Sequence, residues 1–508
     1  MSIRVLTGTT IGEMSRTLFP LLLFVAVLAT QPLASQDAEK PGRPNILFAI
    51  ADDWGWPHAA AYGDAVVKTP SFDRIAAHGM MFDHAYVSSP SCTPSRGAIL
   101  TGKYHWLLGP GANLYGTFRD DLTTYVEILS KTGYAAGCTG KAWGPGRPQT
   151  RGRPLAGKRH KNFGAFLKAR EGDKPFVFWL GTSDPHRPFK KGSGKKSGMD
   201  LSKVHMFGHY PDVEEIRSDV ADYYFEVQRF DRLVGNALNL LEASGELKNT
   251  IVVMTGDHGM PFPRCKSNVY DAGMRVPLAI MWGDRVATPG RTSKQFVSLT
   301  DLAPTFLEAA GVAVPKDMTG RSLMKLLTDP DHEDPRRSSI IFGKERHVPS
   351  QEAPNMGGYP CRAIRTHRYL YIVNYSPDRW PNGTPNFEKA AMPGNWYADT
   401  DNSPTKTYII ANKDKDDVHR RAYELCFAKR PAEEFYDLKA DKDQLRNLAS
   451  DPKVRDEMND LTRKLASLLA VCRDPRSDGK GDQWDHAKYT GGGPKHPSWR
   501  KKKQRRKK

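Results

Sequence analysis

The chain has 508 residues, of which 39% are hydrophobic and 26% are charged. This composition excludes a disordered chain, because it supplies enough side chains to form a core. A mean hydropathy of −0.57 and a single long apolar run exclude a membrane protein with several spans. The formal net charge is +18, of which residues 1–35 contribute +1 and residues 500–508 contribute +8, leaving +9 on the remainder. A body this basic favours acidic partners or substrates.

The apolar run covers residues 18–29, with Arg4 and Arg16 before it and small residues up to Ser35 after it. Its twelve residues are too few to cross a bilayer, which takes about 20. The pattern predicts a signal peptide over residues 1–35, and hence export to a periplasmic, extracellular or lumenal compartment without a stable membrane anchor. The alternatives are a buried helix or a membrane anchor.

Four continuous apolar stretches follow, at residues 44–51, 133–139, 175–181 and 249–255. Such stretches are typical of strands that are buried on both faces. Helical segments lie between and after them, at residues 121–131, 214–244 and 299–310. Alternating strands and helices predict an α/β fold with a large, mostly parallel sheet sandwiched by helices.

The pattern changes near Ile340. Residues 361–373 alternate, which predicts antiparallel strands, and a strand at 434–438 and a helix at 454–471 follow. We therefore predict a smaller C-terminal α+β domain that contains an antiparallel sheet.

Three domain boundaries follow from these changes. The larger domain is expected over residues 36–345 and the smaller one over residues 346–475. Residues 476–508 are rich in Gly, Lys and Asp and end in a basic run, which predicts a disordered tail. No nucleic-acid-binding motif accompanies the basic run, so we expect no nucleic-acid partner. Pairing among Cys361, Cys426 and Cys472 is left open.

Polar residues follow each of the four predicted strands. They are Asp52 and Asp53, Gly140 and Lys141, the segment from Ser183 to His186, and Asp257 and His258. Ligands of open α/β sheets bind at the carboxyl ends of strands. Three carboxylates at one sheet edge repel one another unless a cation neutralises them, and oxygen donors favour Ca²⁺ or Mg²⁺. The alternative for the Asp-Asp pair is a solvated turn.

A further segment reads Cys92-Thr-Pro-Ser-Arg96 and continues to Leu100-Thr-Gly102. Taken residue by residue, it places a cysteine at a turn and an arginine at the start of a helix. The helix N-terminus and the guanidinium both favour an anion there. The alternative is a buried structural cysteine.

Together, in this order, these segments resemble the type I, formylglycine-dependent sulfatases of the alkaline-phosphatase-like superfamily. The resemblance extends from about residue 45 to 449 and includes Asp184-Pro-His186 and the stretch 434–449. Within the family, the stretch 260–270 is most similar to heparan N-sulfatase (N-sulfoglucosamine sulfohydrolase), whereas the Asp257-His258 pair is closer to iduronate 2-sulfatase. The resemblance implies that residues 36–345 are a sulfatase catalytic domain with the alkaline-phosphatase-like fold.

The resemblance also implies the nucleophile and the metal site. Cys92 would be oxidised to Cα-formylglycine by a formylglycine-generating enzyme, and the hydrate of this aldehyde would attack sulfur. One Ca²⁺ would be held by a set of five residues: Asp52, Asp53, Cys92, Asp257 and His258.

Four further roles are carried over in the same way. Arg96 would stabilise the hydrate, and Lys141 and Lys266 would neutralise the sulfate oxygens. His186 would protonate the leaving group. The substrate would be a sulfated carbohydrate, such as a glycosaminoglycan or an algal polysaccharide, carrying a sulfate ester or an N-sulfate.

One position departs from the family pattern. The family's Gly-Lys-x-His reads Gly140-Lys141-Ala142-Trp143 in this chain. The resemblance implies that the family's histidine serves as the base when sulfate is eliminated from the enzyme. An indole cannot accept a proton from an alcohol, so we expect another residue to act as this base. His105 is the candidate that the sequence offers. Two alternative functions are a phosphate or phosphonate ester hydrolase on the same scaffold and a non-catalytic polyanion-binding protein.

Overall fold

The computed structural model describes residues 42–499; the predicted signal peptide and the final basic run lie outside these residues. Eight strands form the larger sheet in the order β10-β2-β9-β8-β1-β7-β4-β6. Their bounds are β1 (Asn45–Ala51), β2 (Met80–Tyr86), β4 (Ala135–Thr139), β6 (Lys158–Arg159), β7 (Phe176–Gly181), β8 (Thr250–Gly256), β9 (Leu278–Met281) and β10 (Arg291–Ser298). Neighbouring strands are parallel except where β9 pairs with β2 and β8. The predicted mostly parallel sheet is confirmed.

Strand β1 lies inside the sheet and all seven of its residues are buried. Its alternate side chains face opposite sides, as a strand requires. Phe48 and Ile50 belong to one apolar cluster, and Leu47 and Ala49 belong to another on the other face. Both faces are therefore covered, which explains the continuous apolar sequence of this strand.

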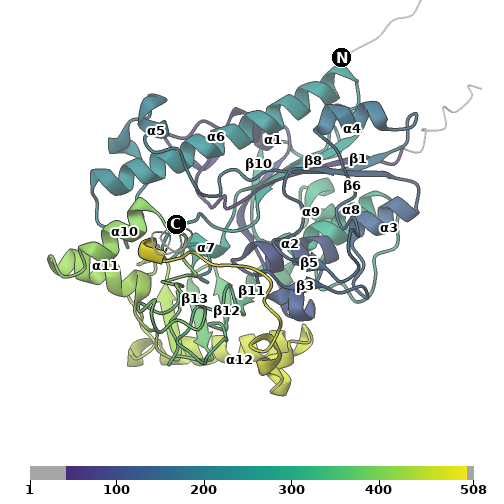
Figure 1. Cartoon of the computed structure of the whole chain (residues 1–508). Coiled ribbons are helices and arrows are strands. Elements are labelled where there is room, and N and C mark those ends of the chain that lie inside the picture. Colours follow the sequence, from purple (N-terminus) through teal and green to yellow (C-terminus); the bar gives the residue numbers. More distant parts are fainter. Residues whose placement is uncertain (1–41, 500–508) are drawn as a thin grey trace, which may run out of the picture. The chain divides into compact units, whose positions relative to one another are not determined.

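Helices cover each face of this sheet (Figure 1). The first face packs against α1 (Pro70–Ala77), α4 (Phe163–Ala169) and α6 (Glu214–Ala243). The second packs against α2 (Cys92–Thr101), α3 (Tyr125–Lys131), α8 (Leu302–Ala309) and α9 (Met324–Thr328). The long predicted helix is confirmed as α6. Helix α3 begins four residues later than predicted, because Thr124 and Glu127 form a reciprocal capping box at its start.

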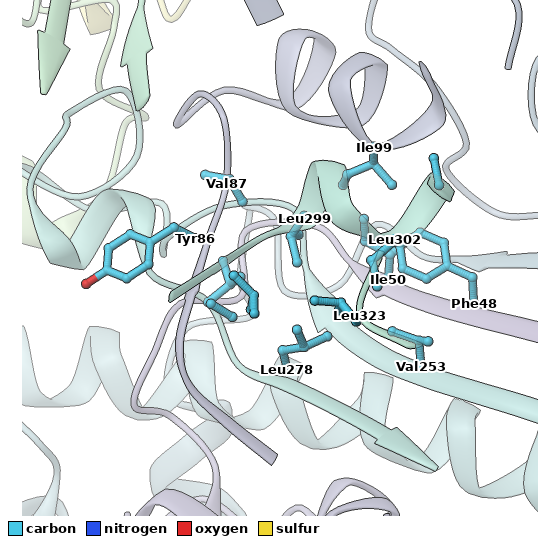
Figure 2. Close-up of a cluster of buried hydrophobic side chains, with 14 of the residues drawn as sticks. Phe48, Ile50, Tyr86, Val87, Ile99, Val253, Leu278, Leu299, Leu302 and Leu323 are labelled. Carbon is cyan, nitrogen blue, oxygen red and sulfur yellow. The ribbon is translucent and has the colours of Figure 1, made fainter. Parts of the chain in front are cut away.

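Helix α2 packs on the apolar cluster that contains Phe48 and Ile50. Figure 2 shows Ile99 of α2 among Phe48 and Ile50 of β1, Val253 of β8 and Leu302 of α8. All ten residues of α2 are buried. The position of the helix start, and with it Cys92, is therefore fixed by packing on the sheet.

The predicted antiparallel sheet is also confirmed. Its four strands have the order β11-β12-β13-β14, and all neighbours are antiparallel. The bounds are β11 (Ser339–Lys344), β12 (Cys361–Thr366), β13 (Tyr369–Asn374) and β14 (Glu433–Asp437). Helix α12 (Arg455–Val471) packs its apolar residues on this sheet, and α10 (Pro404–Ala411) and α11 (Asp417–Phe427) lie between β13 and β14 in the chain.

Residues 476–499 differ from the prediction of a disordered tail. Trp484 is 1% exposed, and its indole Nε1 donates to the Gly109 carbonyl at 3.1 Å. Arg476 donates to the buried carboxylate of Glu345 at 2.5 Å. Average composition predicts disorder here because it gives no weight to single anchoring residues such as these two.

Two smaller features complete the description. Between residues 42 and 499, no helix combines the length and the apolar character needed to cross a bilayer. All six cysteines lie in this part of the chain and are free thiols, so the structure contains no disulfide among Cys361, Cys426 and Cys472.

The packing of Trp484 gives a first prediction. Trp484→Ala should lower the free energy of unfolding by about 3–5 kcal/mol, because a large buried side chain leaves a cavity. Val471→Ala, at a position that is 75% exposed, should change it by less than about 0.5 kcal/mol. Chemical denaturation of both variants checks this, and equal stability of the two would mean that the segment does not pack as described.

Candidate active site

Three buried carboxylates meet at the carboxyl ends of two neighbouring strands. Asp52 and Asp53 follow β1, Asp257 follows β8, and Ala51 pairs with Gly256 in the last register position. The three residues are at most 2% exposed. The backbone N–H of Asp53 donates to Asp257 Oδ1 at 2.8 Å, which holds Asp53 in a left-handed conformation with φ of 75°.

Cys92 faces these carboxylates from the first position of α2. Its Sγ lies 3.6 Å from Asp52 Oδ1 and 3.2 Å from His258 Nε2. Burial raises the pKa of the Cys92 thiol well above its ordinary value, and the opposing attraction of Lys141 does not offset it. An unmodified thiol therefore stays protonated here and is a weak nucleophile.

Three cations balance the carboxylates. Arg96 Nε donates to Asp257 Oδ2 at 2.7 Å, and Lys141 Nζ donates to Asp52 Oδ1 at 2.5 Å. Lys266 Nζ donates to Asp53 Oδ2 at 2.9 Å. Burial alone would lower the pKa of Lys141, but attraction to Asp52 outweighs it and raises this pKa. All three predicted cations thus lie in the predicted site.

The donor atoms around Cys92 fit a bound cation. His258 Nδ1 donates to the Gly259 carbonyl at 3.0 Å, so in the neutral ring its Nε2 carries a lone pair. That atom lies 3.2 Å from Asp53 Oδ1, which accepts no hydrogen bond from any residue between 42 and 499. Two electron-rich atoms facing each other in a buried site require a positive charge between or beside them. Carboxylate oxygens predominate, which favours a hard divalent ion.

Side chains close enough to share one ion form three groups in the described part of the chain. The groups are Asp53 with Cys92 and His258, Asp52 with Cys92 and Asp257, and Asp53 with His186 and Asp401. The first two groups contain all five predicted ligands.

His186 lies at the edge of this cluster. Its Nδ1 donates to the Arg187 carbonyl at 2.6 Å, and its Nε2 is 3.9 Å from Asp53 Oδ2. The side chain is 33% exposed. The ring is therefore held by its backbone contact and remains accessible to a substrate.

Part of this set of side chains borders a cavity of about 680 Å³, whereas Asp53, Arg96, Asp257 and His258 are not among its lining residues. The predicted residues that line it are Asp52, Cys92, Lys141, His186 and Lys266. Trp143 also lines it, with its indole in edge contact with Phe118. Its Nε1 lies 3.3 Å from where a side chain on Gly97 of α2 would begin, so the indole packs tightly against this helix.

His105 is not part of this cavity, contrary to the expectation from the sequence. It is fully buried, its Nδ1 is 2.9 Å from Ser88 Oγ, and its ring contacts Trp106. Proximity to α2 in the sequence suggested this residue, but the chain turns its side chain into the protein interior.

Several cavity residues were not found from the sequence. His347 lines the cavity, and its Nδ1 is 2.8 Å from Ser91 Oγ. Ser91 occupies the N-cap position of α2, yet its hydroxyl bonds His347 instead of capping the helix. Burial lowers the pKa of His347 to about 3, so its ring is neutral at ordinary pH.

The other missed residues come from late parts of the chain as well. Asp401 accepts from Lys266 at 3.0 Å, and Gly492, Gly493 and Pro494 form part of the cavity wall. No motif or spacing links these residues to Cys92, because only the folded chain brings them together.

Comparison with known proteins agrees with this geometry. The family model described as Sulfatase matches residues 44–165 and 160–312, and the model described as N-sulphoglucosamine sulphohydrolase, C-terminal, matches residues 256–381. The chain is 29% identical over 455 residues to an ulvan-active sulfatase of Formosa agariphila, covering 86% of this chain and 82% of the relative.

A second relative and a solved structure match a similar share of this chain. Human N-sulphoglucosamine sulphohydrolase is 27% identical over 504 residues, covering 85% of this chain and 91% of the relative. A structure solved with its substrate D-glucosamine-2-N,6-O-disulfate has a TM-score of 0.61 at 21% identity, covering 86% of this chain and all of the other, which shows the shared fold. Since the Sulfatase model spans more than half of the chain, the protein belongs to the sulfatase family and is a sulfuric ester hydrolase.

Proposed function

We propose that the protein removes a sulfate group from a sulfated carbohydrate, as an ester or an N-sulfate, with residue 92 as the nucleophile. The observation that carries this proposal is the position of Cys92. It begins α2, faces three carboxylates, and shares one cavity with Lys141, Lys266 and His186. The two named relatives act on or are named for carbohydrates, which supports the substrate class.

The proposed maturation makes residue 92 reactive. A formylglycine-generating enzyme would convert Cys92 to Cα-formylglycine, whose hydrate supplies one hydroxyl to attack sulfur and another to expel sulfate. Arg96 is buried and bonds Asp257 while its Nη1 reaches the carbonyls of Lys141 and Ala142. It therefore fixes the turn that carries Lys141 beside residue 92.

The proposed ion is Ca²⁺, held by Asp52, Asp53, Asp257 and His258 together with residue 92. When bound, it would polarise the sulfate group. Lys141 and Lys266 would hold the remaining sulfate oxygens, since both ammonium groups border the cavity. His186 would give a proton from Nε2 to the departing oxygen or nitrogen.

We also propose that His347 replaces the histidine that Trp143 displaces. Its ring is oriented by Ser91 next to residue 92 and lines the same cavity. Burial lowers the pKa of His347 and makes it a weak base before substrate binds, and an anionic sulfate bound beside it would raise that pKa. It would accept at Nε2 the proton that a hydroxyl of residue 92 gives up when sulfate leaves.

Export through the segment 1–35 completes the proposal, because sulfated polysaccharides are extracellular or lumenal substrates.

Replacing the nucleophile tests the proposal directly. Cys92→Ala should abolish sulfate release from sulfated saccharides without changing the unfolding transition. Cys472→Ala removes a thiol that lies outside the cavity and should keep full activity. Mass spectrometry of the peptide around residue 92 should find formylglycine in the active protein; an active Cys92→Ala protein would contradict the mechanism.

Removal of the ion should inactivate the enzyme reversibly. Elemental analysis should find one divalent cation per chain, and chelation followed by added Ca²⁺ should abolish and restore activity. Asp53→Asn should lower both cation content and affinity for sulfate. Asp331→Asn, at an exposed carboxylate, is the control. An active protein that contains no divalent cation would rule out the site.

The role of His347 is tested by His347→Gln. Loss of a general base typically costs about 10²–10⁴-fold, and here it should affect sulfate release and not departure of the saccharide. Rapid-quench kinetics should show a full burst of desulfated saccharide followed by slow turnover. His486→Gln, at an exposed histidine, should show neither effect. Unchanged turnover in His347→Gln would remove this residue from the mechanism.

A further inference from the structure

A segment that passes the cavity contains no acidic residue. Residues 128–170 include ten lysines and arginines and no aspartate or glutamate. The chain as a whole has 75 basic and 57 acidic residues, so this stretch of 43 residues concentrates positive charge well beyond the average. This segment contains Lys141 and the strands β4 and β6, and it ends just after helix α4.

Strand β6 carries part of this charge to the rim of the cavity. It is the end strand of the larger sheet and pairs in parallel with β4, the strand that leads to Lys141. Arg159 lines the cavity, and its guanidinium donates to the carbonyl of Gly140, next to Lys141. The Lys161 carbonyl accepts from Thr139 at 3.2 Å. Arg159 is thus attached to the turn that carries Lys141, and Lys161 to the end of the strand before it.

Arg159, which lines the cavity, and Lys161, two residues further on, form no ion pair within the described residues. Arg159 and Lys161 are exposed, and no carboxylate within residues 42–499 lies within 4.0 Å of either charge. Two other arginines of the same segment do have partners, since Arg153 pairs with Glu127 and Arg170 pairs with Glu246. Arg147, Arg151 and Lys158 of this segment also form no ion pair within residues 42–499, but they do not line the cavity, whereas Arg159 does. Arg159, with Lys161 two residues further on, is therefore the cation of this segment that an anion bound in the cavity would meet first.

The rest of the cavity wall offers a second anion little attraction. Gly492, Gly493 and Pro494 carry no charge, and Asp401 is acidic and pairs with Lys266. A carbohydrate with several anionic groups that places one sulfate beside residue 92 would therefore gain electrostatic stabilisation by extending another anion toward Arg159.

We propose that Arg159 and Lys161 form a second anion-binding subsite, which holds a further sulfate or carboxylate of the same carbohydrate chain. The inference rests on the proposed function, because that function places the first sulfate beside residue 92. The protein then prefers oligosaccharides with two or more anionic groups over saccharides that carry a single sulfate. An arginine suits this task, since its planar guanidinium binds such oxygen anions through two hydrogen bonds.

The test compares two disaccharides that differ only in a second sulfate on the neighbouring sugar. Wild-type protein should have the higher kcat/KM for the doubly sulfated one, and NaCl should reduce this preference. In Arg159→Gln/Lys161→Gln the ratio of the two kcat/KM values should fall about tenfold, as expected for two solvent-exposed charge contacts.

The control removes the same charge elsewhere in the segment. Lys131→Gln/Lys168→Gln changes two exposed lysines that do not line this cavity, and it should keep the ratio. An unchanged ratio in the rim variant, or an equal fall in the control, would overturn the proposal, the latter because net charge alone would explain the preference.

Binding separates this inference from the proposed function. Calorimetry with a dextran sulfate oligosaccharide is carried out on Cys92→Ala protein, which cannot turn over. The rim substitutions should weaken binding about tenfold in this background, and the control substitutions should not. If wild-type protein hydrolysed no sulfated saccharide, the proposed function would fail, while equal binding by the rim and control proteins would overturn the subsite.

Discussion

Three carboxylates buried at one edge of the sheet are the constraint on which the rest of this structure depends. Asp52, Asp53 and Asp257 repel one another where water cannot screen them. The chain offsets this cost with Arg96, Lys141 and Lys266, each on a different element. Because removal of one partner from a buried pair leaves an unpaired charge, these elements are locked together. The position of α2, and thus of Cys92, follows from that network as much as from apolar packing.

The later part of the chain completes the site through a second buried network. Lys344 at the end of β11 donates to Asp399 and to the carbonyls of Ser267 and Pro381. Asp399 in turn accepts from the backbone N–H of Val348 and from Ser350 Oγ. This network holds the loop that carries His347 against the loop that carries Asp401. The smaller sheet therefore positions cavity residues as well as packing beside the larger one.

The fold could be predicted where one physical signal dominates. Strands β1, β7 and β8 are buried on both faces, so their sequences are continuous apolar runs. Strands β2 and β10 were missed, because each mixes buried positions with partly or fully exposed ones and neither gives a clean alternation. The segment 476–499 was misjudged because a few anchors, above all Trp484, outweigh its polar composition.

The site could be predicted only where chemistry coincides with a strand end or a motif. Asp257 and Lys141 follow buried strands, and Cys92 and Arg96 belong to one helical turn. His347 and Asp401 follow no such rule, since their place depends on long-range contacts that no local pattern encodes. His105 shows the converse, because closeness in sequence to α2 did not bring it to the cavity.

The central claim is that this acidic cluster, with residue 92, holds a divalent cation. The most direct measurement is a crystal structure of the matured protein with anomalous diffraction data collected for calcium. We expect an anomalous peak bounded by Asp52, Asp53, Asp257 and His258, with formylglycine at residue 92 beside it. A well-ordered site in active protein that has no such peak and an unmodified Cys92 would contradict the account.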